Sequence, residues 1–511
     1  MSADPNSARL VVPDPHIATA HMKVSHAHWA VHQFGKASRE TVLKVAEAVA
    51  RAGHAKAGHY ADWAVRETGF GVVEHKKIKN ELSTLPLLDY YRDLDLVSPR
   101  VLPDEKMVEL PKAAGVVFAI IPATNPIATL YYKAMLAILS RNAIVFSPHP
   151  AARECSVDAA KMLAEAAEAA GAPAGLIQCI EHPSVPLVQE IMASDKIAVI
   201  MATGGGPMVR AAYSSGNPAL GVGPGNAVAY VDPSAKVDAA AKRLVDSKSF
   251  DNSVLCTNES VVLTLDSNRG NMERALRSAG AHLCNEADTD KLREYLFTDK
   301  GLNVAAVGKS AAWIAEKAGI RVSPSVRILV PVITAPGQDD TLFREKLCPV
   351  LTLAAAVDFQ QAMTIAAQIM RRGGGHSAAF HGEAPDRLLQ FSNALPVYRV
   401  VVNAPCSQGA AGFATHLPPS FMIGTGFAGR SSVGENVGPQ HLVHWTRIAY
   451  NSDASVPFDQ FDMSVLDSKS PATPKQSHAQ YTAPSALPDT DRDKLRQLIL
   501  EELKGLTGGH K

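Results

Sequence analysis

Short apolar runs and longer helical stretches alternate along the chain from about residue 38 onward. Between residues 38 and 68 the apolar positions recur at helical spacing, with Val42, Val45 and Val49 on one face. Beyond this helix, apolar runs separated by helix-length segments predict strands at 115–121, 142–146, 176–180 and 198–201. Strands separated in this way predict right-handed βαβ units and a parallel sheet. We therefore expect an α/β fold.

A second α/β block begins near residue 253 and extends to about 433. The strands expected in it lie at 260–263, 327–331, 350–354, 378–380 and 399–402. A chain of 511 residues is too long for one compact core, so more than one domain is expected.

The composition changes at residues 464–488, where Pro, Ser, Ala, Thr and Gln dominate and large apolar residues are scarce. This composition is typical of a linker. Beyond it, Thr490 and Asp493 have capping-box spacing and predict a short amphipathic helix. The apolar face of this helix consists of Leu495, Leu498, Ile499, Leu503 and Leu506.

Charge and cysteine content narrow the class of protein. Lys+Arg and Asp+Glu both number 50, so no basic excess indicates a nucleic-acid partner. Gly, Pro or charge interrupts every apolar run, so no membrane span is expected, and the first residues lack a secretory-signal pattern. Six cysteines without a CxxC motif fit the reducing cytoplasm. No HExxH, paired CxxC or EF-hand loop is present, so no metal is expected.

Cys256 is the strongest candidate for chemistry. It lies between a helical stretch and the apolar run 260–263. A thiol at such a junction can face a cleft and act as a nucleophile once ionised. An isolated cysteine is more often a small core residue, which is the interpretation given to Cys348 and Cys406. A catalytic interpretation of Cys256 therefore requires support from other motifs in the chain.

Three further motifs could serve a cofactor or substrate. The turn 203–206 (Thr-Gly-Gly-Gly) follows a strand and precedes a helix, so its backbone amides could approach a phosphate. It is not a GxGxxG motif, and such turns are at least as often only turns. Asn125 follows a strand and could either donate to an oxyanion or cap the next helix. Glu345 could bind ribose hydroxyls or be a solvated surface residue.

These segments occur together in the order and approximate spacing of the aldehyde dehydrogenase superfamily. The chain resembles its CoA-acylating branch, as in the aldehyde domain of bifunctional aldehyde–alcohol dehydrogenases and in bacterial microcompartment aldehyde dehydrogenases. The resemblance covers roughly residues 20–460. The matching stretches are 121–126, 140–150, 202–207, 219–226, 250–256, 346–350 and 432–439.

The resemblance implies a role for each matching residue. Cys256 is similar to the nucleophile that attacks the aldehyde, and Asn125 to the residue that stabilises the oxyanion. Glu345 is similar to the carboxylate that holds the nicotinamide ribose. No spacing assigns a general base, so His376 and His441 both stay open. The other residues expected to contact the cofactor are Ile121, Pro122, Ser147, Pro148, His149, Thr203, Gly204, Gly205 and Gly206.

One departure from the hydrolytic branch bears on the reaction. Where hydrolytic members have a motif similar to Glu-Leu-Gly-Gly-Lys, this chain has Ala219-Leu220-Gly221. The resemblance implies that the Glu of the hydrolytic members activates water. General-base help is worth roughly 10²–10⁴-fold, so without it water attacks a thioester slowly. A thiol such as that of CoA ionises more easily than water. The missing carboxylate therefore favours acyl transfer to CoA.

The resemblance also implies the architecture. We expect a Rossmann-like cofactor-binding domain at 1–252, a catalytic α/β domain at 253–436 and a small β oligomerisation element at 437–463. A linker at 464–487 and a C-terminal helix at 488–511 would follow. That helix resembles the encapsulation peptides of microcompartment cargo, and the competing interpretation is packing on the enzyme's own oligomer.

The implied function is oxidation of a short-chain aldehyde with NAD(P)⁺ and CoA, giving acyl-CoA and NAD(P)H through a Cys256 thioester. Acetaldehyde or propionaldehyde is expected, with sulfoacetaldehyde, lactaldehyde or a semialdehyde left open. NAD is preferred over NADP only mildly, because His149 has no acid beside it. The alternatives are a hydrolytic dehydrogenase, a cysteine acyltransferase without a redox step, and a catalytically idle cargo protein.

The implied partners follow from the same resemblance. A homodimer or tetramer is expected in the cytoplasm, inside a microcompartment if residues 488–511 bind shell proteins. Neither a nucleic acid nor a membrane is expected.

Overall fold

The computed structural model describes residues 16–299, 301–333 and 340–466. The chain separates into two units, Met1–Asn451 and Ser452–Lys511. In the second unit the described residues contain a short 3-10 turn, Met463–Leu466. Most of the expected linker and the whole helix expected at 488–511 lie outside the described residues.

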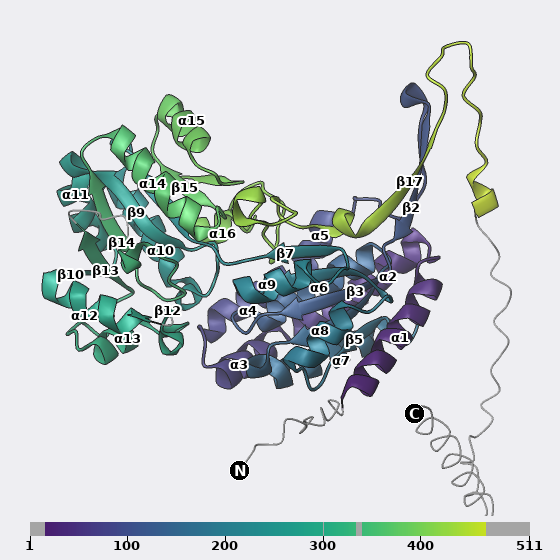
Figure 1. Ribbon diagram of the computed structural model, residues 1–511, viewed down its shortest axis with the longest axis horizontal. Coiled ribbons are helices and arrows are strands. Elements are labelled where there is room, and N and C mark those ends of the chain that lie inside the picture. Colours follow the sequence, from purple (N-terminus) through teal and green to yellow (C-terminus); the bar gives the residue numbers. More distant parts are fainter. Residues whose placement is uncertain (1–15, 300, 334–339, 467–511) are drawn as a thin grey trace, which may run out of the picture. The chain divides into compact units, whose positions relative to one another are not determined.

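A five-stranded parallel sheet organises the first half of the larger unit (Figure 1). Its strand order is β5-β4-β3-β6-β7, so the order reverses between β3 and β6. Open α/β sheets bind ligands in the crevice that such a reversal leaves at the carboxyl ends of the strands. The strands are β3 (Val116–Ile121), β4 (Ala143–Pro148), β5 (Ile177–Cys179), β6 (Ile197–Thr203) and β7 (Ala219–Val222). The helices of this half are α1 (Ile17–Phe34), α2 (Arg39–Ala55), α3 (Ala57–Thr68), α4 (Val73–Leu82), α5 (Leu85–Tyr91), α6 (Pro126–Leu139), α7 (Arg153–Ala169), α8 (Val185–Met192) and α9 (Gly206–Tyr213).

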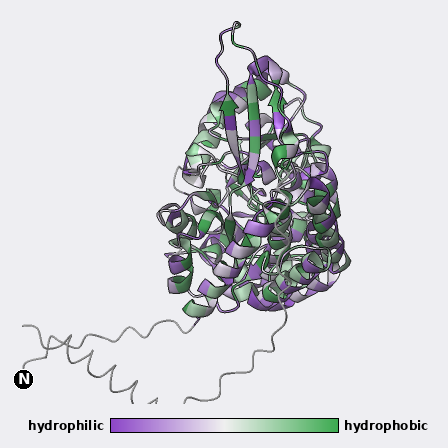
Figure 2. Ribbon diagram, turned by 90° about the vertical axis from the view of Figure 1, so that its right-hand side faces the viewer, coloured by the Kyte–Doolittle hydropathy of each residue, from purple (hydrophilic) through white to green (hydrophobic). Residues whose placement is uncertain are grey.

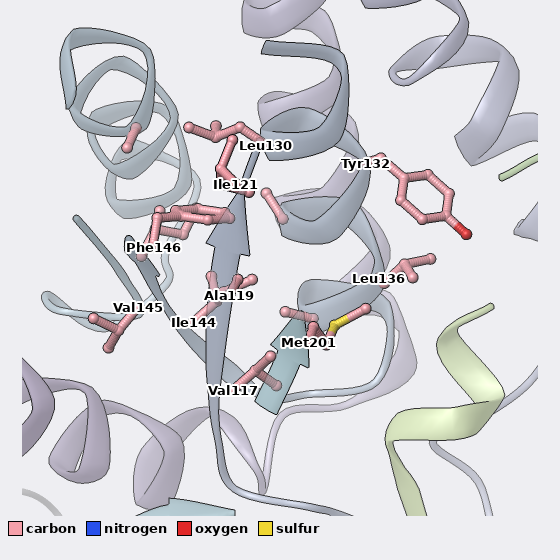
Figure 3. Packing of buried hydrophobic residues seen from close by; sticks show 14 of the residues in the cluster. Val117, Ala119, Ile121, Leu130, Tyr132, Leu136, Ile144, Val145, Phe146 and Met201 are labelled. Atoms are coloured by element: carbon pink, nitrogen blue, oxygen red, sulfur yellow. The ribbon is translucent and has the colours of Figure 1, made fainter. Parts of the chain in front are cut away.

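Complete burial explains the continuous apolar runs of these elements. All six residues of β3 and all 14 residues of α6 are buried. Figure 3 shows side chains of β3, β4, β6 and α6 packed against one another. Strands of parallel sheets that helices cover on both faces read as continuous hydrophobic runs for this reason. The strands expected at 115–121, 142–146, 176–180 and 198–201 are confirmed.

A seven-stranded parallel sheet organises the second half. Its order is β10-β13-β14-β9-β8-β15-β16, and it contains all five strands expected between residues 253 and 433. The strands are β8 (Ala227–Val231), β9 (Glu259–Leu265), β10 (Ala281–Cys284), β13 (Ile328–Ile333), β14 (Thr352–Ala356), β15 (Ala378–His381) and β16 (Val400–Val402). The helices are α10 (Val237–Ser249), α11 (Asp266–Ser278), α12 (Glu286–Leu296), α13 (Ala311–Ala318), α14 (Phe359–Gly373), α15 (Pro385–Ala394) and α16 (Cys406–Gly409). A small hairpin joins β11 (Phe297–Thr298) to β12 (Gly301–Leu302).

The chain passes from one sheet to the other between Val222 and Ala227, earlier than the boundary expected at 252. Strand β8 pairs with β9 and β15, so it belongs to the seven-stranded sheet. Helix α10 packs in the same hydrophobic cluster as β8. Residues 227–249 therefore belong structurally with the seven-stranded sheet, because the short apolar run at 227–231 forms strand β8.

A three-stranded antiparallel sheet joins segments that are far apart in the sequence. Strand β2 (Met107–Ala113) pairs with β1 (Arg100–Leu102) on one side and with β17 (Val443–Ala449) on the other. The β element expected at 437–463 thus contains β17, while its other two strands come from residues 100–113. Hydrophobic and hydrophilic residues mix along these strands, as Figure 2 shows, and most of β17 is at least partly exposed.

Two further observations concern the first described helix and the search for membrane-spanning helices. Helix α1 begins at Ile17, one residue after the first residue that the structure describes. Within the described ranges, no helix combines the length and the apolar character that crossing a membrane would require.

Candidate active site

Residues that precede five neighbouring strands meet at one edge of the seven-stranded sheet. Strands β14, β9, β8, β15 and β16 are adjacent and parallel, so their amino ends share an edge. The residues found there, in chain order, are Gly225, Cys256, Glu345, His376 and Arg399. These residues are up to 174 positions apart in the sequence, and the sheet topology brings them together.

A tight turn places Cys256 at this edge. Asp251, Asn252 and Ser253 all have positive φ, at 49°, 49° and 65°. Left-handed conformations are costly for residues other than glycine and persist only where the surroundings hold them. Here the backbone N–H of Val72 donates to Asp251 Oδ1 over 2.7 Å, and Asn252 Nδ2 donates to the Gly308 carbonyl over 2.9 Å.

His376 lies against the thiol. Its Nε2 atom is 3.3 Å from Cys256 Sγ, and its Nδ1 atom is 2.8 Å from Ser377 Oγ. Arg399 Nη1 donates to the His376 carbonyl over 2.8 Å. Burial, with the Arg399 charge as a smaller cause, holds the pKa of His376 well below its usual 6.5. The imidazole is therefore neutral and can accept a proton.

The surroundings of Cys256 keep its proton in place at rest. Burial is the larger cause and the charge of Glu345 the next, and together they raise the pKa of the Cys256 thiol to about 12. Arg399 acts in the opposite direction. The side chain is nevertheless partly exposed, so a small molecule can reach it.

Asn125 contacts the loop that carries Cys256. It is the N-cap residue of α6, but its side chain makes no capping hydrogen bond, so the capping interpretation is wrong. Its Nδ2 instead donates to the Val254 carbonyl over 2.9 Å, and its Oδ1 accepts from Lys79 Nζ. An amide N–H thus points at the backbone two residues before Cys256.

Glu345 and Gly225 connect Cys256 to a cavity. Glu345 Oε1 accepts from the Gly225 N–H over 3.0 Å. A Cβ atom added to Gly225 would lie 2.1 Å from the Cys256 carbonyl oxygen, so the two backbones are in close contact. Burial raises the pKa of Glu345 to about 7, against the opposing effects of the Gly225 N–H, Lys248 and Lys346. Glu345 is therefore a site residue and not a solvated surface residue.

The cavity has a volume of about 690 Å³ and draws its lining from both halves of the chain. Its lining residues include Gly206 of the glycine turn, Gly225 and Glu345. Three arginines also line it, and none of them has an ion-pair partner among the residues the structure describes. They are Arg210, Arg344 and Arg430. Unpaired guanidinium groups of this kind bind phosphates well.

The other residues expected to contact the cofactor lie at the carboxyl ends of β3, β4 and β6. Ile121 is paired with Pro148, and the His149 N–H donates to the Ile121 carbonyl over 3.0 Å. Ser147 is buried and His149 is exposed. This group flanks the point where the strand order reverses. None of residues 147–149 lines the cavity that contains Glu345.

The glycine turn fits a phosphate-bearing cofactor. Gly205 caps α9, which begins at Gly206, so the free N–H groups of the helix start there. The buried hydroxyl Oγ1 of Thr203, just before the turn, has no hydrogen-bond partner within the described part of the chain. A bound cofactor would supply one. No described cluster of three His, Cys, Asp or Glu side chains could hold a metal.

The structure also gives the surroundings of Ala219 and His441. Ala219 starts β7, where its carbonyl accepts from Ser432 Oγ over 3.0 Å. None of residues 219–226 is acidic. His441 bonds to Gly438 and pairs with Glu435, so only His376 of the two open histidines contacts the thiol.

Comparison with known proteins places this site in a family. The aldehyde dehydrogenase family model matches residues 10–448. The chain is 39% identical over 395 residues to an aldehyde-alcohol dehydrogenase of Clostridium acetobutylicum, covering 76% of this chain and 45% of that protein. The chain thus spans about half the length of the aldehyde-alcohol dehydrogenases it matches.

Solved structures agree with this match. An acetylating aldehyde dehydrogenase from Geobacillus thermoglucosidasius has a TM-score of 0.84 at 35% identity, covering 86% of this chain and 98% of that one. A propionaldehyde dehydrogenase from the Clostridium phytofermentans fucose utilisation bacterial microcompartment has a TM-score of 0.78 at 26% identity, covering 86% and 98%. A propionaldehyde dehydrogenase of Rhodopseudomonas palustris with bound propionyl-CoA has a TM-score of 0.76 at 26% identity, covering 84% and 94%. With a match over most of its length and a consistent fold, the chain belongs to the aldehyde dehydrogenase family.

Proposed function

We propose that this chain oxidises a short-chain aldehyde with a nicotinamide cofactor and transfers the acyl group to CoA. The observation that carries the proposal is the contact between Cys256 Sγ and His376 Nε2 beside a cavity lined by unpaired arginines. The acetylating and CoA-bound relatives support the same reaction class.

The first step is attack by Cys256. As Sγ bonds to the aldehyde carbon, His376 Nε2 accepts the thiol proton, because the imidazole is neutral and 3.3 Å away. The carbonyl oxygen becomes an oxyanion. Asn125 Nδ2 and the backbone N–H of Cys256 would donate to it, and such donors are worth about 10²–10³-fold each.

The bound cofactor would accept the hydride, leaving the acyl group on Cys256 as a thioester. The residues that would hold it are Thr203, Gly205 and Gly206 on the phosphate side and Glu345 on the ribose side. Gly225 keeps Glu345 fixed through its N–H.

The second half of the reaction replaces the cofactor by CoA. His376 first releases to solvent the proton it took from Cys256. The CoA sulfur then bonds to the acyl carbon while its proton passes to His376, the bond from the acyl carbon to Cys256 Sγ breaks, and His376 returns the proton to the Cys256 thiolate. Arg210, Arg344 and Arg430 would bind the CoA phosphates. Hydrolysis lacks a base on the segment 219–226, and Glu345 is engaged with Gly225.

The test is turnover of propionaldehyde with and without CoA, following cofactor reduction and the product by mass spectrometry. CoA-dependent formation of propionyl-CoA is expected. Equal turnover without CoA, giving the free acid, would mean that another group activates water and that the chain is a hydrolytic dehydrogenase.

The finer assignments are part of the same proposal. NAD is the expected cofactor, but only mildly preferred because His149 has no acid beside it. Comparing kcat/KM for NAD with kcat/KM for NADP tests this preference. The sheet β1-β2-β17 is the proposed oligomerisation element, to be tested by the mass of the assembly in solution. The proposed localisation in a microcompartment is supported by the sequence of residues 488–511 and by the similarity to a microcompartment enzyme. Deleting residues 488–511 is expected to abolish co-purification with shell proteins.

A further inference from the structure

Two lysines of α4 are buried next to the candidate oxyanion site. The side chains of Lys76 and Lys79 are 4% and 3% exposed, and both contact the fully buried carboxylate of Asp251. Lys76 and Lys79 are three positions apart, so they lie on the same face of the helix. We call Lys76, Lys79 and Asp251 the buried charge cluster.

The two lysines differ in what else they contact. Lys79 Nζ donates to Asn125 Oδ1 as well as to Asp251 Oδ2. Lys76 Nζ donates to the Thr124 carbonyl over 2.8 Å and to Asp251 over 3.2 Å, and does not contact the Asn125 side chain. Lys79 is therefore the member of the cluster that acts on the amide.

This contact decides which way the Asn125 amide points. Because Lys79 Nζ donates to Oδ1, Nδ2 faces the loop that carries Cys256, where it donates to the Val254 carbonyl. The flipped amide would place its NH₂ group against the N–H groups with which Lys79 donates to Asn125 and Asp251, and its oxygen against the Val254 carbonyl, which is two unfavourable contacts. The adjoining cavity of about 10 Å³ has room for at most about one water, so little solvent is available to relieve those two contacts.

The same cluster also supports the second oxyanion donor. Asp251 Oδ1 accepts from the Val72 N–H, and its carboxylate contacts both lysines through Oδ2. Asp251 opens the strained turn that leads to Cys256, whose backbone N–H is the other donor. The cluster thus connects the two donors through one carboxylate.

We propose that Lys79 is a positioning residue that holds the Asn125 amide in the orientation that stabilises the oxyanion. The proposal rests on the proposed function of Asn125. Lys79 itself is buried and does not line the cavity that contains Glu345. A residue that acts only through Asn125 has no effect once Asn125 is removed, which gives the proposal a sharp test.

The test is a double-mutant cycle between Lys79→Met and Asn125→Ala, with kcat, KM for cofactor and the burst of acylated Cys256 as readouts. Lys79→Met is expected to lower kcat and the burst rate by about 10²-fold, the size of losing one oxyanion donor, with KM for cofactor changed less than about threefold. In the Asn125→Ala background the same substitution is expected to change kcat less than about twofold.

Lys76→Met is the matched control, because it removes a charge from the same carboxylate without touching the amide. In the double variant with Asn125→Ala, the fold-loss in kcat is expected to equal the product of the fold-losses of Lys76→Met and Asn125→Ala alone. Two results would overturn the proposal. One is a loss of kcat from Lys79→Met that is equally large in the Asn125→Ala background, and the other is a Lys79→Met kcat within about threefold of the parent.

Should Lys79→Met fail to fold, Lys79→Gln replaces it in the same cycle. Failure of the proposed function is seen separately, because the parent enzyme would then form no acyl-CoA from aldehyde, cofactor and CoA.

Discussion

His376 Nε2 lies 3.3 Å from Cys256 Sγ, and the two groups have pKa values displaced in opposite directions. The pKa of the thiol is raised to about 12 and that of the imidazole falls well below 6.5. At neutral pH the resting pair is therefore a thiol that donates to a neutral imidazole. The proton moves to His376 only when the sulfur forms a bond to the substrate.

Replacing His376 is expected to slow acylation. His376→Gln should lower the pre-steady-state burst of cofactor reduction by about 10²–10⁴-fold, because among the described residues His376 is the base that hydrogen-bonds to the thiol. Stopped-flow absorbance measures the burst. His441→Gln is the control, since His441 contacts Gly438 and Glu435 and not Cys256. An undiminished burst in His376→Gln would assign the base elsewhere.

The reactivity of Cys256 should depend on pH without a plateau in the neutral range. Because the raised pKa lies at about 12, the thiolate fraction grows about tenfold per pH unit below that value. Alkylation by iodoacetamide, followed by mass spectrometry of the Cys256 peptide, should therefore accelerate steadily from pH 7 to 10.

Glu345→Gln should make the same alkylation faster. The negative charge of Glu345 raises the pKa of Cys256, so removing it lowers that pKa and increases the thiolate fraction at pH 8 several-fold. Cys256→Ser abolishes the label and identifies the site. A rate that is already level between pH 7 and 8 in the parent enzyme would contradict the thiol–imidazole state.

The parts of the site that the sequence predicts are those that local motifs carry. Cys256 and Asn125 lie in motif stretches, and Glu345 directly precedes one. In the structure Gly225 packs against the backbone of Cys256, and its N–H donates to Glu345. The buried parallel strands were predictable for a similar reason, since β3 is an uninterrupted apolar run.

What the sequence does not reveal depends on long-range contacts. His376 is a single histidine after three glycines, and only the pairing of β15 with β8 brings it to Cys256. Lys76 and Lys79 belong to the run His-Lys-Lys-Ile-Lys, which looks like a solvated helix face. Lys77 in that run is indeed exposed, while Lys76 and Lys79 are buried because Asp251 reaches them on α4 from 175 and 172 residues away.

The unpaired arginines of the cavity should recognise CoA through its phosphates. Arg210→Gln and Arg430→Gln are each expected to raise KM for CoA by about tenfold, the size of losing one charge-assisted hydrogen bond. The increase should shrink at high salt. Steady-state kinetics at two salt concentrations measure both effects. Arg269→Gln, on the surface of α11 and paired with Asp266, controls for net charge. An unchanged KM in both cavity variants would place CoA elsewhere.

Gly225 should tolerate no side chain. A Cβ there would lie 2.1 Å from the Cys256 carbonyl oxygen and 3.4 Å from the His376 ring, so Gly225→Ala must move the loop that carries the nucleophile. We expect a loss of about 1–3 kcal/mol of stability, typical of overpacking, and a fall in kcat of at least about 10²-fold. Gly223 lines the same cavity, but a Cβ there meets nothing within 4 Å. Gly223→Ala should therefore keep the Tm of the parent within about 1 °C. Thermal unfolding and burst kinetics of the two variants compare them directly, and equal behaviour would mean that Gly225 and Cys256 are not in contact in solution.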